Sequence, residues 1–282
     1  MEGRARAPAA GTVLNALATG TGAAFAIDEY VTATVSLDEA STGVTGHIAD
    51  APDADTTLVE TAVTHTLDAI DVTAGGTVET TSAVPMASGL KSSSAAANAT
   101  VLATLAATDA TLPPEDAARI GVAAAREAGV TVTGAFDDAA ASMLGGVVVT
   151  DNDADELLHH DTFETTVLVW TPPTRAYSVD APVEKCRRVA SVADHVRDLA
   201  LASRYPTAMT VNGLAFTAAL DYDPTPLLEA LPHAAGATLS GTGPSVIAVG
   251  DRDSLRPVYD RWQDREGDTW LTTTQQTGAT RT

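Results

Sequence analysis

The segment PMASGLKSSSAAANAT, which begins at Pro85, most restricts how this chain can fold. A strand-like alternation of residues ends at Pro85, and an alanine-rich run with strong helix propensity follows three consecutive serines. Between them lie a glycine and Lys91, one of only two lysines in the chain. The segment therefore predicts a strand, a tight loop and a helix start whose first backbone N–H groups lack partners within the helix.

Strand and helix patterns alternate along the rest of the 282 residues. Strand-like runs occupy 30–37, 75–85, 145–151, 165–173 and 269–274, and 236–251 predicts a strand, a glycine-rich turn and a strand. Helical patterns occupy 55–70, 95–108, 112–129, 183–203, 206–220, 224–232 and 253–263. The alternation is too irregular for a doubly wound sheet, so we predict an α+β fold in two parts.

Residues 152–161 are polar and typical of turns, which places a domain boundary near them. We predict one domain over residues 1–155 and a second over 156–282. Residues 275–282 are expected to form a polar tail, and the sequence contains no internal repeat.

The chain carries 37 acidic and 16 basic residues, a formal net charge of −21. The acidic residues are scattered along the sequence, which argues against nucleic-acid or anionic-membrane partners because both would be repelled. A cationic partner and adaptation to a salt-rich cytoplasm both fit this charge, and the even spread favours the second. Any anionic substrate then needs a local positive site.

The sequence offers few other constraints on location or assembly. The single cysteine, Cys186, excludes an intrachain disulfide, and we expect it to pack inside a helix. No apolar run is long enough to span a membrane, and the N-terminus does not resemble a signal peptide. We therefore expect a cytoplasmic protein, and the sequence does not reveal its oligomeric state.

The loop after Pro85 has two interpretations. As a phosphate-binding loop, Gly89 permits close approach of backbone, Ser92, Ser93 and Ser94 supply hydroxyl groups, and Lys91 adds a positive charge to that of the helix N-terminus. As a plain helix start, the serines cap the helix. The segment does not match the Walker A loop, since neither lysine follows a glycine.

Two further segments carry candidate chemistry. The turn LSGTGPS, residues 239–245, is either a simple hairpin turn or a site where backbone amides approach a phosphate or a sugar. The segment TGAFDDAAASMLGG contains the adjacent acids Asp137 and Asp138 ahead of Gly145 and Gly146. On a helix, neighbouring side chains point about 100° apart, which leaves two interpretations. In the first, one aspartate meets a substrate hydroxyl and the other caps the helix; in the second, both are helix caps or solvated surface residues.

These three segments, in this order, resemble the motifs of the GHMP kinases. PMASGLKSSSAA matches the family's phosphate loop, SGTGPS its C-terminal glycine motif, and APAAGTVLNA stands at the place of its N-terminal motif. The resemblance implies an N-terminal ATP-binding domain similar to ribosomal protein S5 domain 2 and a ferredoxin-like C-terminal domain, with the active site between them. AAGTVLNALATGTGAAFAID, Lys91 and TGAFDDAAAS resemble the archaeal-type shikimate kinases within this family.

The resemblance also implies roles for individual residues. Asp138 takes the role of catalytic base, with Asp137 as its alternative, and Ser93 and Glu127 the role of Mg²⁺ ligands. The expected ATP site consists of Pro85, Met86, Ala87, Ser88, Gly89, Leu90, Lys91, Ser92, Ser93, Ser94, Ala95, Ala96, Gly241, Thr242 and Gly243.

One departure from the family pattern concerns a lysine that mevalonate-type members carry in the N-terminal motif, beside the catalytic aspartate. Thr12 stands at that position here. The resemblance therefore implies a catalytic aspartate without the lysine of the N-terminal motif. It also implies a catalytic Lys91 in the phosphate loop, where it neutralises the β- and γ-phosphates of ATP.

The implied reaction is ATP-dependent phosphorylation of the 3-hydroxyl of shikimate, a small-molecule substrate. Asn15, Thr12, Arg175 and Arg204 are the candidates for holding the substrate, whose carboxylate needs a polar or cationic partner. The alternatives are another small-molecule kinase of the family, acting on homoserine or mevalonate, and a non-catalytic nucleotide-binding relative.

Overall fold

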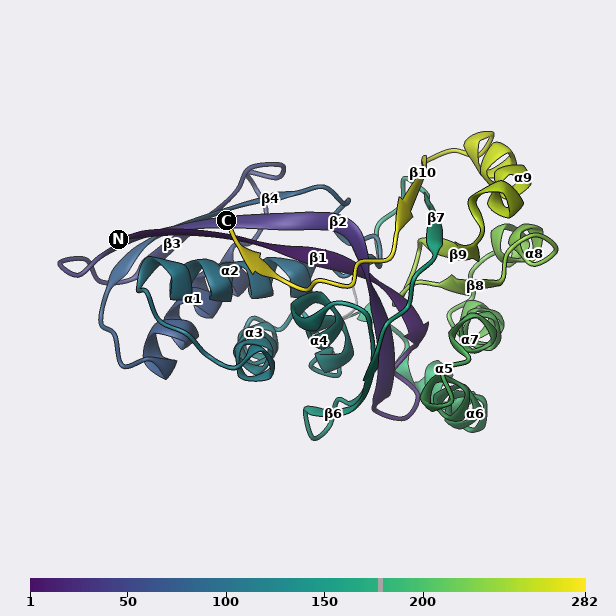
Figure 1. The fold of residues 1–282 in the computed structure, drawn as a ribbon, viewed down its shortest axis with the longest axis horizontal. Helices are drawn as coiled ribbons and strands as arrows, with labels where there is room; N and C mark the ends of the chain where they lie inside the picture. The colour runs from purple at the N-terminus through teal and green to yellow at the C-terminus, as the bar shows by residue number, and fades with distance from the viewer. Residues whose placement is uncertain (177–179) are drawn as a thin grey trace.

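In the computed structural model, residues 1–176 and 180–282 are described, and they form two sheets flanked by helices (Figure 1). Among these residues the first sheet has seven strands, with the central order β11-β1-β2-β4-β3, and β5 and β6 continue it beside β2. Its strands are β1 (Glu2–Leu14), β2 (Thr21–Asp38), β3 (Val44–Ile48), β4 (Gly75–Ser82), β5 (Val147–Asp151), β6 (Glu156–Asp161) and β11 (Thr280–Arg281).

Four helices cover one face of this sheet: α1 (Thr57–Ala69), α2 (Ser92–Ala107), α3 (Pro114–Glu127) and α4 (Phe136–Leu144). Their buried faces are rich in alanine, so α2 and α4 pack close to the strands and to α3. Close packing holds the N-terminal ends of α2 and α4, which carry Lys91 and Asp138, near the same end of the sheet.

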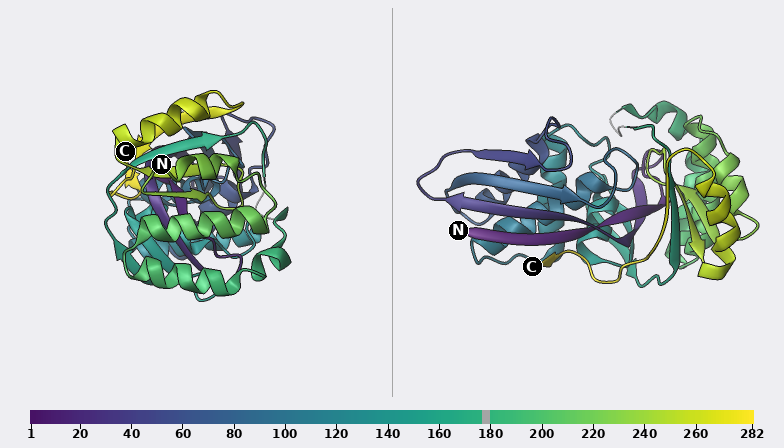
Figure 2. Two further views of the ribbon diagram at one scale, coloured as in Figure 1. Left: turned by 90° about the vertical axis from the view of Figure 1, so that its right-hand side faces the viewer. Right: turned by 90° about the horizontal axis from the view of Figure 1, so that it is seen from above.

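The second sheet has the strand order β10-β7-β9-β8, built from β7 (Thr166–Thr171), β8 (Gly236–Leu239), β9 (Val246–Gly250) and β10 (Asp268–Thr273). Helices α8 (Thr225–Ala230) and α9 (Arg252–Gln263) pack on one face of this sheet. Helices α5 (Val183–Arg187), α6 (Ala190–Leu201) and α7 (Tyr205–Ala219) contribute to the core that its other face shares with the first sheet, at the end of the molecule opposite the N-terminus (Figure 2). In chain order these elements run strand, helices, two strands, helix and strand, as in a ferredoxin-like domain. The α+β prediction is confirmed.

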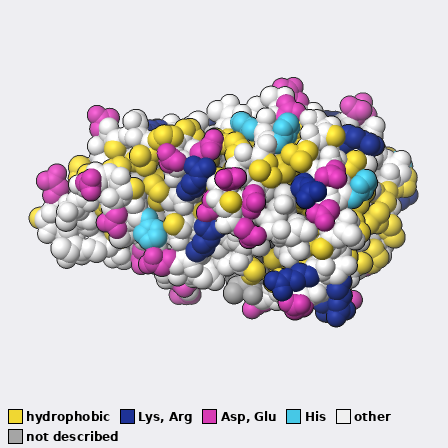
Figure 3. Space-filling model, turned by 90° about the horizontal axis from the view of Figure 1, so that it is seen from below, with side chains coloured by type: hydrophobic (Ala, Val, Ile, Leu, Met, Phe, Trp, Pro, Cys, Tyr) yellow, Lys and Arg dark blue, Asp and Glu magenta, His cyan; other side chains and the backbone are white. Residues whose placement is uncertain are grey.

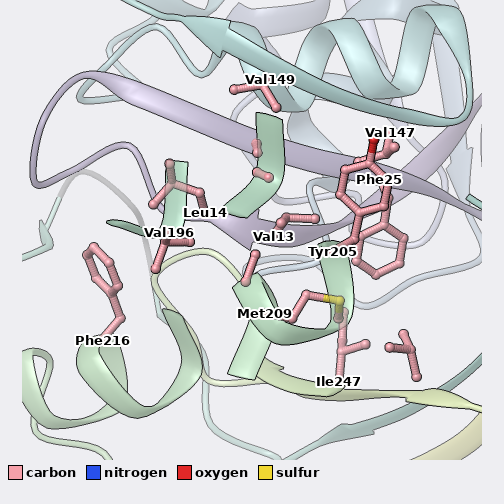
Figure 4. Packing of buried hydrophobic residues seen from close by; sticks show 14 of the residues in the cluster. Val13, Leu14, Phe25, Val147, Val149, Val196, Tyr205, Met209, Phe216 and Ile247 are labelled. Atoms are coloured by element: carbon pink, nitrogen blue, oxygen red, sulfur yellow. The ribbon is translucent and has the colours of Figure 1, made fainter. Parts of the chain in front are cut away.

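A shared hydrophobic core joins the two halves (Figure 4). Val13, Leu14 and Phe25 from the first sheet meet Met209 and Phe216 of α7, and all five are fully buried. Burying each such side chain stabilises the fold by about 1.5–3 kcal/mol. This core brings the start of α7 and the β8–β9 turn against the end of β1.

The structure corrects several expectations. Residues 152–161 include strand β6, which pairs with β5, so the first sheet continues past residue 155 to Asp161. The division into domains at residue 155 stays a prediction. The helix expected over 183–203 is two helices, α5 and α6. The backbone N–H groups of Arg188 and Val189 each donate to the carbonyl three residues earlier, and this 3₁₀-type turn separates the two helices.

The expected polar tail is part of the fold. Thr280 and Arg281 pair with β1, and the backbone N–H of Ala279 donates to the carbonyl of Met143 in α4. A Cβ on Gly278 would lie 1.9 Å from that same carbonyl oxygen, so the tail runs directly along the end of α4. The last residues therefore fasten the helix that carries Asp137 and Asp138.

Candidate active site

A small open cavity lies between the two halves, where predicted residues from all three motifs meet. Lys91 comes from the start of α2, Asp137 and Asp138 from the first turn of α4, and Gly241 and Thr242 from the β8–β9 turn. The remaining lining residues are Asn15, Ala16, Leu17, Thr131, Val132, Thr133 and Ala135.

Lys91 and Asp138 form an ion pair inside this cavity. Lys91 Nζ lies 2.9 Å from Asp138 Oδ1, and each side chain is only 11% exposed. Lys91 is the residue before α2 and adopts a left-handed backbone conformation, with φ of 63°. Lys91 of the phosphate loop therefore places its ammonium group beside Asp138, and its predicted role at the phosphates of ATP stays a prediction.

The pKa of Asp138 is raised from its ordinary value of 3.8 to about 7. Burial of the carboxyl group is the main cause, and the neighbouring charge of Asp137 adds to it. The Lys91 ammonium opposes both effects and lowers this pKa. A carboxyl group that titrates near neutral pH is suited to accept a proton during a reaction.

Asp137 is a buried residue of the cavity lining and is held by Asn152. Asn152 Nδ2 donates to Asp137 Oδ1 over 2.7 Å, and the backbone N–H of Asp137 donates to Asn152 Oδ1 over 3.1 Å. Thr150 also donates its hydroxyl to Asn152 Oδ1. The expected capping role is wrong, because no side-chain cap is formed at α4.

The phosphate loop and the glycine turn pack directly on each other. Ser240 Oγ donates to the carbonyl of Gly89 over 2.9 Å, and the N–H of Ser245 donates to the carbonyl of Ser88 over 3.2 Å. A Cβ on Gly89 would lie 2.3 Å from the Ser240 carbonyl oxygen. Gly89 is thus required for the approach of this second loop.

The serines after Lys91 do not cap α2. No side-chain cap is present at this helix, and Ser93 is exposed. The plain-cap interpretation therefore loses its support. The first backbone N–H groups of α2 are left available for an anionic group, which their partial positive charge favours.

The other candidate residues lie in different places. Asn15 lines the cavity, but Asn15 Nδ2 donates to the carbonyl of Gly241 and Asn15 Oδ1 accepts from the N–H of Leu17. Thr12 is fully buried, and its hydroxyl accepts from the N–H of Gly241. Arg175 lines a neighbouring cavity with Tyr222 and Thr242, and Arg204 precedes α7, outside both cavities.

Glu127 lies at the end of α3, where its carboxylate contacts His65 over 2.8 Å. Its side chain is 65% exposed and does not line the cavity with Asp138. Among the described residues, no group of three or more histidine, cysteine or acidic side chains is arranged to hold a metal ion.

Sequence reasoning missed two buried asparagines near the site, Asn152 and Asn212. Asn212 is spaced three residues after Met209 and four before Phe216, within the apolar stripe of α7. A polar residue in an apolar stripe is the available signal for a buried network. Asn152 gave no such signal, because it lies between two aspartates in a segment typical of turns.

Comparison with known proteins agrees with this geometry. Residues 57–146, which contain the phosphate loop and both aspartates, match the family model of the GHMP kinases N terminal domain. A shikimate kinase of Halobacterium salinarum is 60% identical over 281 residues, covering 99% of each chain. A shikimate kinase of Methanosarcina mazei is 45% identical over 264 residues, covering 93% of this chain and 90% of that protein.

Solved structures share the fold at low sequence identity. A homoserine kinase from Cytophaga hutchinsonii superposes with a TM-score of 0.79 at 18% identity, covering 100% of this chain and 97% of that chain. The mevalonate kinase of Methanococcus jannaschii has a TM-score of 0.79 at 15% identity, with 98% of each chain covered. Together with the full-length sequence match, these findings establish that the chain belongs to the GHMP kinases and, within them, to the archaeal-type shikimate kinases.

Proposed function

We propose that this protein transfers the γ-phosphoryl group of ATP to the 3-hydroxyl of shikimate, yielding shikimate 3-phosphate and ADP. The buried pair of Lys91, at the start of α2, and Asp138, in the first turn of α4, carries the proposal, because it joins a proton acceptor to a fixed positive charge. The full-length similarity to proteins named shikimate kinase supports the choice of substrate.

Asp138 acts as the base. Its carboxylate receives the proton of the 3-hydroxyl as the new bond from that oxygen to phosphorus forms and the bond to the β-phosphate oxygen breaks. General-base assistance of this kind typically contributes about 10²–10⁴-fold to the rate. Burial holds the carboxylate out of bulk water, so its proton affinity suits this task near neutral pH.

Lys91 stabilises negative charge both on the Asp138 carboxylate and on the phosphates of ATP. Its ammonium keeps part of the Asp138 population ionised, and it lies beside the first turn of α2, where exposed N–H groups favour phosphate oxygens. Phosphoryl transfer depends mainly on positioning and electrostatic stabilisation, so these groups supply much of the catalysis. In a chain of net charge −21, Lys91 and the N-terminal end of α2 are the positive groups that we assign to the nucleotide phosphates.

The residues present fit a Mg²⁺ ion that enters with the nucleotide. Mg²⁺ commonly keeps several waters and is bound by one or two protein oxygens together with substrate phosphates. The exposed hydroxyl of Ser93 is our candidate ligand, whereas Glu127 is bound to His65 outside the cavity. The ion neutralises phosphate charge when bound.

Among the described residues, no helix is both long and apolar enough to cross a membrane. We place the protein in the cytoplasm, where ATP is available. Among residues 1–176 and 180–282, no arginine lines the cavity with Asp138, so the substrate carboxylate depends on backbone N–H groups and hydroxyls such as those of Thr131 and Thr133.

The test is ADP release at high KCl with Mg-ATP, with shikimate, homoserine and mevalonate offered in parallel. Release with shikimate alone is the expected result. Release with homoserine or mevalonate instead keeps the kinase and rejects the substrate. No release with any acceptor, from folded protein that binds ATP, favours a non-catalytic nucleotide-binding role.

A further inference from the structure

Both peptide groups around Gly241 are held by side chains from distant parts of the chain. The N–H of Gly241 donates to Thr12 Oγ1 over 2.8 Å, and its carbonyl accepts from Asn15 Nδ2 over 2.7 Å. Thr12 lies on β1 and Asn15 directly follows it, whereas Gly241 lies in the β8–β9 turn. The glycine turn is therefore fastened across the boundary between the two halves.

Asn212 of α7 forms the centre of this network. Its Oδ1 accepts from the backbone N–H of Asn15 over 2.9 Å, and its Nδ2 donates to Thr238 Oγ1 over 2.9 Å. The side chain is fully buried. Asn212 thus bonds to Asn15, whose side chain holds the Gly241 carbonyl, and to Thr238 of β8, the strand that precedes Gly241.

Gly241 in turn limits where the Lys91 side chain can lie. A Cβ built on Gly241 would be 2.9 Å from Lys91 Nζ and 3.4 Å from its Cε. Lys91, Asp138, Asn15 and Gly241 all line the same cavity. A shift of the glycine turn would therefore change the space available to the ammonium group beside Asp138.

We propose that Asn212 is a positioning residue for phosphoryl transfer, which acts through Asn15 and Thr238 to hold Gly241 against Lys91. The inference rests on the proposed function of this site. Asn212 itself does not line the cavity. A buried amide whose two ends are both bonded defines one arrangement, because any rotation leaves buried polar groups unpaired.

The test compares Asn212→Ala with Thr217→Val. Thr217 lies on the same helix and is buried, and its hydroxyl has no hydrogen-bond partner among the described residues, so it controls for a general effect on α7. We expect Asn212→Ala to lower kcat about tenfold or more, since small misplacements near reacting groups are costly, with KM values near those of the wild type.

Two further readouts separate positioning from a loss of stability. Asp137 and Lys91 are the charged groups that act on Asp138, and a displaced Lys91 would move the acid limb of the kcat profile to higher pH in Asn212→Ala. Hydrogen exchange of the peptide covering residues 239–245 should be faster in Asn212→Ala and unchanged in Thr217→Val. A kcat, pH profile and exchange rate like those of Thr217→Val would overturn the proposal.

If Asn212→Ala does not fold, Thr238→Val decides the question, because it removes the acceptor of Asn212 Nδ2 and otherwise only the hydroxyl bond from Thr238 to the neighbouring carbonyl of Leu239. The proposal is supported if Thr238→Val lowers kcat, by less than the fall expected for Asn212→Ala, and speeds hydrogen exchange of residues 239–245. A kcat and an exchange rate like those of the wild type overturn it. Wild-type protein that releases no ADP with shikimate would contradict the proposed function, and the exchange comparison would still decide whether Asn212 holds the turn.

Discussion

Asp138 lies between two charges of opposite sign, and its proton affinity reflects both. Burial and Asp137 raise its pKa, and Lys91 lowers it, with the result near 7. The base must be ionised to accept a proton, so the rate should fall as pH decreases through this value. If Asp138 is the base, as we propose, charge and burial around this one carboxyl group set the acid limit of activity.

We expect two substitutions to move this acid limb in opposite directions. Asp137→Asn keeps an acceptor for Asn152 but removes the negative charge, which lowers the pKa of Asp138 and moves the limb to lower pH. Lys91→Met removes the positive charge, which raises the pKa and moves the limb to higher pH, with a large fall in kcat. The measurement is kcat against pH from about 5.5 to 9, a window that brackets the pKa of Asp138.

A shift of the acid limb in the same direction in Asp137→Asn and in Lys91→Met would contradict this electrostatic account. A profile without an acid limb in the wild type would show that Asp138 is not the titrating base. Thermal unfolding of each variant serves as the control for folding.

At the scale of elements, the site depends on how closely the phosphate loop and the β8–β9 turn approach. Gly89 has φ of 85°, a conformation that glycine adopts readily, and the carbonyl oxygens of Ser240 and Gly243 occupy the space where a Cβ would be. The two loops therefore behave as one unit around the start of α2.

Gly89→Ala should separate these loops. We expect it to destabilise the fold by about 1–3 kcal/mol, through backbone strain and steric overlap, and to raise KM for ATP several-fold. Gly129→Ala is the matched control, because Gly129 also has positive φ, of 67°, but has nothing within 4 Å of its Cβ position. The measurements are urea unfolding and KM for ATP, and equal KM values in the two variants would refute the close-packing argument.

The elements that could be predicted from the sequence are those with strong local patterns. The helices over 55–70 and 112–129 are confirmed as α1 and α3, since apolar periodicity and Pro at the helix start are local signals. Strand β11 and the fastened tail could not be predicted, because two polar residues pair with β1 only in the folded molecule. The pairing of Lys91 with Asp138 likewise depends on the packing of α2 beside α4, which no local pattern encodes.

At the scale of the whole molecule, the core between the halves creates the site. Val13 and Leu14 of β1 pack against α7, and the next residues of the chain, Asn15 to Leu17, line the cavity. The family resemblance implied a site between two domains, but the residues that join them came only from the structure. The C-terminal strand β11 also pairs with β1, so both ends of the chain lie on the first sheet (Figure 1).

The acidic surface predicts a dependence on salt. On the face drawn in Figure 3, acidic side chains are scattered among basic ones and do not gather in a single patch. With a net charge of −21, self-repulsion should be screened as the Debye length falls from about 10 Å at 0.1 M salt to about 3 Å at 1 M. We expect Tm to rise with KCl, most steeply below about 1 M, where screening changes most.

Thermal unfolding from low to high KCl measures this dependence. A Tm that is constant or falls over the first molar would refute screening as a source of stability. A rise that stays linear to saturation would point to exclusion of salt from the protein surface instead.

The central claim is that Asp138 is the base for phosphoryl transfer to shikimate. The most direct measurement is kcat for shikimate-dependent ADP release by the wild type and by Asp138→Asn, with ATP affinity measured by calorimetry in both. The account predicts that kcat falls about 10²–10⁴-fold while ATP affinity stays near the wild-type value. A folded Asp138→Asn protein that keeps half or more of the wild-type rate would contradict it.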